Sequence, residues 1–129
     1  MREIISTSTA PQAIGPYSQA IACGGMLFVS GQIAIDPAVG DVIDGDIEAQ
    51  TEQVLENLSA IIAAGGMTLK DVAKCSCFLK NMGDFARFNG VYERYFGEIL
   101  PARETIEVAR LPKDVLVEVS AICVNPNIS

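Results

Sequence analysis

The sequence predicts an α+β fold in which two helices pack on one face of a single mixed β-sheet. Several segments alternate apolar and polar residues with a period of two, and two others repeat apolar residues with a helical period. Together these segments follow the order β, β, α, β, α, β, β, which is typical of a layered α+β domain. The 129 residues are enough to bury one core, so we expect residues 1–129 to form one domain.

The first two strands are predicted to pair as a hairpin. Residues 17–23 and 26–35 are rich in strand-forming side chains, and they flank Gly24-Gly25, a dipeptide typical of a two-residue hairpin turn. Residues 2–6 are a candidate for a short additional strand before this hairpin.

A helix is predicted over residues 47–64, and two glycines follow it as a C-terminal cap. We expect Asn57 to lie on its solvent-exposed face with Glu52 and Glu56. The apolar stripe of this helix is formed by Val54, Leu55, Leu58, Ile61 and Ile62.

The rest of the chain predicts one more helix and three more strands. Residues 71–80 alternate as a strand, and residues 84–100 form an amphipathic helix with its aromatic side chains near one face. Strands over residues 102–111 and 114–124 complete the sheet, with Leu-Pro-Lys-Asp as the turn between them.

The last strand is apolar on both faces. One face carries Val115, Val117, Val119, Ala121 and Cys123; the other carries Leu116, Ile122 and Val124, with Glu118 and Ser120 between them. Two helices cover only one side of a sheet, so another chain must cover the second apolar face. We therefore expect a homo-oligomer with closed symmetry.

The composition excludes several classes of partner. A net charge of −7 without a basic stripe argues against a nucleic-acid partner. No run of Lys and Arg indicates a membrane surface, and no apolar stretch approaches the roughly 20 residues that span a bilayer. The N-terminal residues lack the apolar segment of a secretory signal, so we expect a cytoplasmic protein.

Four cysteines, Cys23, Cys75, Cys77 and Cys123, lie in apolar, strand-like segments. Their spacing does not match a zinc site, which usually takes turn-borne pairs completed by His or further Cys. We expect free, buried thiols and no metal.

Arg103 and Glu118 are charged residues within apolar segments. If the last two strands pair with each other, Arg103 lies level with Val124 and does not face Glu118 directly. Two interpretations remain open: an interfacial ion-pair network, or a small-molecule site. In such a site Arg103 would bind a carboxylate through two parallel hydrogen bonds, and Glu118 would handle a proton or a water.

Other candidates have a structural and a functional interpretation. Tyr17 is either a core or interface aromatic or a hydroxyl donor, and Asn89 precedes a glycine in the middle of a helix, where both disfavour helix. Ser30-Gly31 places a glycine inside a strand, which often marks the close approach of a ligand. The absence of histidine excludes Ser-His and Cys-His catalysis, and no phosphate-binding glycine motif is present, so we expect no cofactor.

The motifs AIGPYSQA, LFVSGQIAIDP, QTEQVLENLSAIIAAGG, FARFNGVY, PAR and VARLPKDVLVEVSAI occur in this order. In this combination the chain resembles the RidA (YjgF-like) imine/enamine deaminases from about Ile4 to Val124. The resemblance implies a chorismate-mutase-like fold and a homotrimer with clefts between the subunits. It also implies hydrolysis of 2-aminoacrylate, 2-aminocrotonate or their imine tautomers, released by pyridoxal-phosphate enzymes, to 2-keto acids and ammonia.

The resemblance also implies roles for individual residues. It places the carboxylate-binding arginine at Arg103, the water-orienting glutamate at Glu118 and the pocket tyrosine at Tyr17. The pocket lining is matched by Asn89, Ser30 and Gly31.

Thr105 departs from the family pattern, because many members have cysteine at this position; its backbone N–H still suits a substrate carboxylate.

Two alternative functions stay open. One is a binding module that senses 2-keto acids and regulates a partner, and the other is the aminoacrylate deaminase of pyrimidine breakdown.

Overall fold

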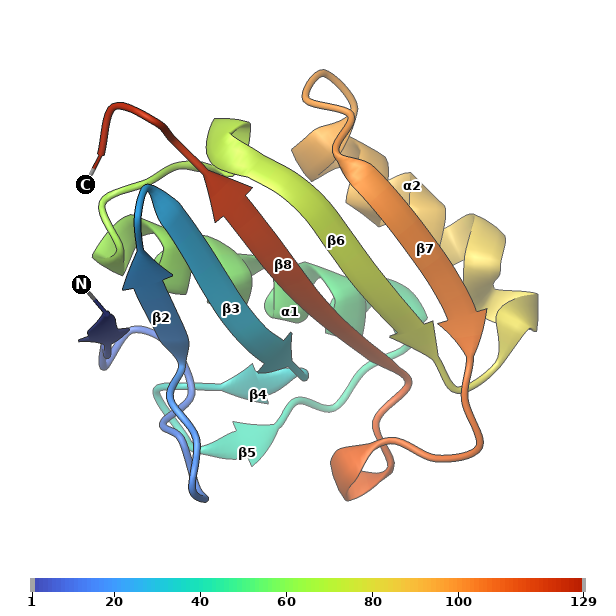
Figure 1. The fold of residues 1–129 in the computed structure, drawn as a ribbon. Helices are drawn as coiled ribbons and strands as arrows, with labels where there is room; N and C mark the ends of the chain where they lie inside the picture. The colour runs from blue at the N-terminus through green and yellow to red at the C-terminus, as the bar shows by residue number, and fades with distance from the viewer. Residues whose placement is uncertain (1, 129) are drawn as a thin grey trace.

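Strand β8 (Val117–Val124) lies near the centre of a six-stranded sheet in the computed structural model, which describes residues 2–128 (Figure 1). The strand order is β1-β2-β3-β8-β6-β7, and only the β6–β7 pair is parallel. Helices α1 (Ile47–Ala64) and α2 (Phe85–Phe96) lie together behind this sheet. The predicted α+β class, with two helices on one mixed sheet, is confirmed.

The other strands are β1 (Glu3–Ile5), β2 (Ala20–Cys23), β3 (Met26–Gln32), β6 (Val72–Leu79) and β7 (Ala102–Glu107), with the small pair β4 (Ile35–Asp36) and β5 (Asp41–Val42). Short 3₁₀ turns cover Leu69–Asp71, Met82–Asp84 and Pro112–Asp114. Met1 and Ser129, which the expected domain 1–129 includes, lie outside the described residues.

The β2–β3 hairpin forms at the predicted turn, where both glycines take positive φ angles (58° at Gly24 and 78° at Gly25). Both strands are shorter than predicted. Strand β2 begins at Ala20 because residues 17–19 belong to the preceding loop, and β3 ends at Gln32 after its register against β8 shifts between Val29 and Gln32.

Helix α1 has the predicted bounds, and the side chain of Asp46 caps its first turn by accepting a hydrogen bond from the Ala49 N–H (3.0 Å). The predicted exposure of Asn57 is wrong, since this residue is only 1% exposed. Its amide turns inward because it bonds the main chain just beyond β3.

The chain turns at Pro112–Asp114 as predicted, but the last two strands do not pair with each other, so the condition that would set Arg103 level with Val124 is not met. Strand β6 lies between β7 and β8, and it pairs Arg103 with Cys75 and Cys75 with Ala121. Arg103 therefore lies level with Ala121, two strands away, and not with Val124. The physical reason is burial: β8 is apolar enough for the interior of the sheet, while the more polar β7 takes the edge.

The core lies between the sheet and α1, whose predicted apolar stripe is fully buried. All four cysteines are free; Cys75, Cys77 and Cys123 are buried as expected, whereas Cys23 is exposed where β2 meets its turn. Among residues 2–128, no helix has the length and apolar character needed to cross a membrane.

Candidate active site

Arg103 projects from edge strand β7 toward helix α2. Its Nη1 donates a hydrogen bond to Oδ1 of Asn89 (2.8 Å), and its Cζ lies 4.6 Å from the centroid of the Tyr92 ring and 5.6 Å from that of Phe85. An arginine side chain has five N–H donors in a planar fork. One contact to Asn89 and stacking on two rings orient the guanidinium and leave donors for an anion.

A cavity of about 420 Å³ surrounds this guanidinium; we call it the Arg103 cavity. It lies between the end of α2 and the start of β7, where Leu100 takes a φ of 55° as the chain turns back. Its lining includes Asn89, Tyr92, Phe96, Leu100, Pro101 and Arg103. The cavity combines a cation with an aromatic and aliphatic wall, which suits a small carboxylate carrying an apolar group.

Two buried hydroxyl groups beneath this region have no hydrogen-bond partner in the described part of the chain, those of Tyr92 and Thr105. Thr105 pairs with Cys77 in the sheet, so it shares the helix-side face with Arg103. Burial raises the pKa of the Tyr92 hydroxyl, which stays protonated at neutral pH. The thiols of Cys75 and Cys77 lie beside the Tyr92 and Thr105 hydroxyls, respectively, and thiols form only weak hydrogen bonds, so neither hydroxyl has a strong partner.

Glu118 lies on the opposite face of the sheet. Its carboxylate rests against the backbone of Gly31 in β3, so closely that a Cβ added at Gly31 would overlap it. Burial raises the pKa of Glu118 above its usual value, and no charge among the described residues offsets this. The side chain is therefore a poorly solvated carboxylate, which holds a proton more strongly than an exposed one.

A smaller cavity of about 180 Å³ opens beside this carboxylate; we call it the Glu118 cavity. Its lining includes Tyr17, Gly31, Ile33, Ile35, Lys113 and Glu118. Tyr17 is 52% exposed and lines this cavity from the loop before β2. The Glu118 cavity thus brings a carboxylate, a phenol and the Lys113 side chain together within a wall of aliphatic and amide groups.

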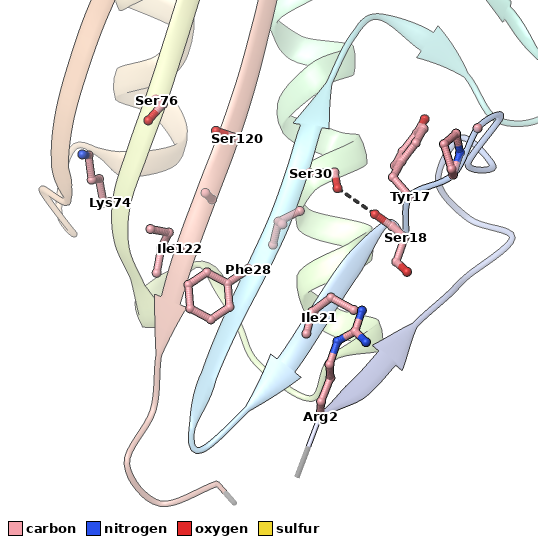
Figure 2. A pocket seen from close by; sticks show the side chains of 14 residues that line it. Arg2, Tyr17, Ser18, Ile21, Phe28, Ser30, Lys74, Ser76, Ser120 and Ile122 are labelled. Atoms are coloured by element: carbon pink, nitrogen blue, oxygen red, sulfur yellow. Dashed lines mark hydrogen bonds between the residues drawn. The ribbon is translucent and has the colours of Figure 1, made fainter.

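Ser30 lies next to Gly31 but lines a different, larger cavity of about 690 Å³ on the face of the sheet that no helix covers. Figure 2 shows Tyr17 at one end of this hollow and Ser76, Ser120 and Phe28 along its floor. The Oγ of Ser30 donates to the main-chain oxygen of Ser18 (2.6 Å), so this hydroxyl stabilises the loop that carries Tyr17.

The structure does not bring Arg103 and Glu118 together within one chain. On β6, Cys75 pairs with Arg103, and Phe78, three positions further along, pairs with Glu118. Strand β6 lies between the strands that carry the two charged residues. Standard sheet spacings give about 10 Å along the strands and about 10 Å across them. Since the side chains also point to opposite faces, one subunit offers two half-sites and no shared pocket.

The first half-site contains Arg103, Asn89 and Thr105, and the second contains Glu118, Gly31 and Tyr17. Sequence reasoning missed Tyr92, which supports the guanidinium. Its position three residues after Asn89 puts it on the same helix face and was a usable signal. Residues 2–128 contain no group of three His, Cys, Asp or Glu side chains that could hold a metal ion.

Comparisons with known proteins agree with this fold. A family model described as Endoribonuclease L-PSP matches residues 7–125. The RutC family protein PH0854 of Pyrococcus horikoshii is 57% identical over 122 residues, 95% of this chain and 97% of the relative. The E. coli TdcF structure with bound serine shares 43% identity at a TM-score of 0.91, covering 95% of this chain and 98% of TdcF.

The E. coli YjgF gene product shares 45% identity at a TM-score of 0.91, and the match covers 95% of this chain and 98% of that protein. Both the sequence family and the fold are therefore established by matches over nearly the whole chain. The chain belongs to the endoribonuclease L-PSP family, which includes the YjgF and RutC proteins, as its resemblance to RidA predicted.

Proposed function

We propose that this protein is a cofactor-free 2-iminobutanoate/2-iminopropanoate deaminase. It hydrolyses 2-aminoacrylate, 2-aminocrotonate or their imine tautomers to 2-keto acids and ammonia. The observation that carries the proposal is the pair of half-sites: a guanidinium oriented by Asn89 and a poorly solvated carboxylate against Gly31. The TdcF structure contains serine, a small amino acid of the size that the Arg103 cavity admits.

The complete site forms between subunits of a homotrimer. Arg103 lies on the edge strand, where a neighbouring chain has access to it, and Glu118 lies on the face that no helix covers. That face exposes large apolar groups, among them Phe28 (43%) and Val124 (41%), as expected of a surface that another copy covers. Trimer formation brings Arg103 of one subunit to the Glu118 cavity of the next.

Substrate binding comes first. The guanidinium of Arg103 holds the substrate carboxylate through two parallel hydrogen bonds, and the backbone N–H of Thr105 supplies a further donor. Tyr17 approaches the substrate from the loop that lines the Glu118 cavity. The iminium carbon is already electrophilic, so the chemistry requires a positioned water and no strong nucleophile.

Glu118 takes a proton from this water while the oxygen forms a bond to the iminium carbon. It then returns the proton to the amino nitrogen of the carbinolamine. As the C–N bond breaks, the hydroxyl proton passes to Glu118 and the keto oxygen forms; the released ammonia takes up this proton as ammonium, which restores the carboxylate. A raised pKa suits this role, because the best general base titrates near the working pH. Free imines hydrolyse readily in water, so a small reduction of the barrier is sufficient.

Two other functions use the same cavities. A sensor of 2-keto acids would bind product without turnover, and an aminoacrylate deaminase of pyrimidine breakdown would carry out the same hydrolysis in another pathway. The family description also names an RNA-cleaving activity. The net charge of −7 and the absence of histidine disfavour that activity, because no cationic surface or imidazole base serves a phosphodiester.

A coupled assay tests the proposal. A pyridoxal-phosphate threonine dehydratase generates 2-aminocrotonate, and the rate of 2-ketobutyrate formation is followed with and without this protein. We expect acceleration by the wild-type protein, a large loss with Glu118→Gln, and no loss with Arg87→Ala, which removes exposed ion pairs with Asp46 and Glu48. Binding of 2-ketobutyrate without acceleration would establish the sensor instead, and cleavage of added RNA would support the nuclease.

A further inference from the structure

Three buried amide side chains hold the walls of the Glu118 cavity. Gln19, Gln50 and Asn57 are 3%, 7% and 1% exposed, and they are three of the five buried polar residues among residues 2–128. The other two are Gln32, which lines the same cavity, and Thr51, which bonds its own helix. Buried amides are retained where their hydrogen bonds are satisfied, so the partners of these three indicate their purpose.

Gln19 holds the wall formed by the loop before β2. Its Oε1 accepts from the Thr7 N–H (2.7 Å), and its Nε2 donates to the main-chain oxygens of Pro11 (2.7 Å) and Thr7 (3.1 Å). The main-chain oxygen of Gln19 accepts from the Ser30 N–H (2.9 Å). Gln19 thus joins two parts of the cavity wall. Its side chain binds the loop that carries Pro11, which lines the cavity, and its main chain binds Ser30, the neighbour of Gly31.

Asn57 holds the wall that follows β3. Its Nδ2 donates to the main-chain oxygens of Ile33 (3.1 Å) and Ile35 (2.9 Å), both of which line the cavity. Its Oδ1 accepts from Nε2 of Gln53 (2.9 Å), which sets the orientation of the amide. Two hydrogen bonds from one buried side chain therefore attach this wall to helix α1.

Gln50 holds the third wall, where the chain enters β8. Its Oε1 accepts from the Leu116 N–H (2.9 Å). Leu116 lies between Lys113, which lines the cavity, and Glu118 itself. A core amide thus fixes the main chain two residues before the carboxylate.

We propose that Gln19, Gln50 and Asn57 are positioning residues that keep the walls of the Glu118 cavity in place and the Glu118 carboxylate against Gly31. This inference rests on the proposed function only for its effect on catalysis. Loss of an amide loosens one wall and admits water to the carboxylate, whose pKa then falls toward its usual value. The guanidinium that holds the substrate carboxylate is oriented by Asn89 and Tyr92 and not by these amides, so substrate carboxylate binding changes little.

Isosteric variants give the sharpest test. In Gln19→Glu and Asn57→Asp, a carboxyl oxygen replaces an amide nitrogen that faces carbonyl oxygens, three at Gln19 and two at Asn57. A protonated carboxyl still donates to a carbonyl, whereas an ionised one repels these oxygens. We therefore expect kcat of both variants to approach the wild-type value at acidic pH and to fall by up to about 100-fold as pH rises, with little change in KM.

Thr51→Val is the matched control, since it removes a buried hydrogen bond to Ile47 that has no connection with the cavity. It should lower the melting temperature and leave the pH profile of kcat and the pKa of Glu118 unchanged. If the amide variants behave like this control, and kcat simply follows the folded fraction, the positioning role is overturned.

A second readout does not depend on deaminase activity. Carbon NMR of the Glu118 carboxyl in Gln19→Ala and Asn57→Ala should give a lower pKa than in the wild type. Hydrogen exchange of the Thr7 amide should accelerate in Gln19→Ala. An inactive wild-type protein with these shifts would contradict the proposed function alone, whereas an active one with an unshifted Glu118 pKa would contradict the positioning role alone.

Discussion

The Glu118 carboxylate occupies the space that a side chain at position 31 would need, so glycine at this position is a condition of its placement. The contact joins β8 to β3 at the point where their register shifts. Any side chain at residue 31 must displace either the carboxylate or the backbone.

Gly31→Ala should therefore reduce the deaminase kcat by about 100-fold, because the added methyl group moves the general base away from the water. Measurement of kcat and KM separately checks this, and KM should change little. A variant with wild-type kcat would show that the position of Glu118 is unimportant for turnover.

Gly90→Ala is the companion substitution in helix α2. Nothing lies within 4 Å of the added methyl group, and alanine favours a helix interior by about 1 kcal/mol over glycine. Thermal or denaturant unfolding should show a more stable protein with unchanged kcat. A less stable variant would mean that residue 90 has a contact in the assembled protein that one chain does not show.

Arg103→Lys should lower kcat/KM by about 10- to 100-fold, mainly through KM. Lysine keeps the charge but loses the two parallel hydrogen bonds and the stacking on Tyr92. Arg94→Lys, at an exposed ion pair with Glu52, is the control and should leave both constants unchanged. Equal effects of the two substitutions would exclude a specific carboxylate clamp.

Glu118→Gln should stabilise the protein at neutral pH while it abolishes activity. Burial raises the pKa of Glu118 in the folded state above the usual 4.5, so the folded state binds the proton more tightly than the unfolded state. The wild type therefore loses stability as pH rises from about 4.5 through the raised pKa, and the variant lacks this loss. Unfolding curves from pH 4 to 8 should converge at the acidic end; parallel curves would contradict the shift.

Mixed trimers test whether the site is shared between subunits. Arg103→Ala and Glu118→Gln chains are each expected to be inactive, but random mixing leaves an intact pair in about one cleft in four. Unfolding and refolding of an equal mixture should therefore restore about a quarter of the wild-type activity. No recovery, with trimers confirmed by mass, would place the whole site within one chain.

Much of the local structure could be predicted because its causes are local. Gly24-Gly25 adopts the positive φ angles of a tight turn, and residues 47–64 show the period of a helix, so both elements agree with the sequence. The predicted exposure of Asn57 is wrong because an amide beside the apolar stripe of a helix gives the same sequence pattern in two cases: when its side chain faces water, and when it bonds the main chain of another segment.

The sequence by itself determined the fold class, the family and the types of side chain available for chemistry, including the absence of histidine. Only the tertiary structure decided that β8 lies between β3 and β6, and hence that Arg103 and Glu118 face opposite sides of the sheet. The reason is that strand order depends on hydrogen bonds and burial between distant segments. The periodicity of a single strand does not specify its neighbours.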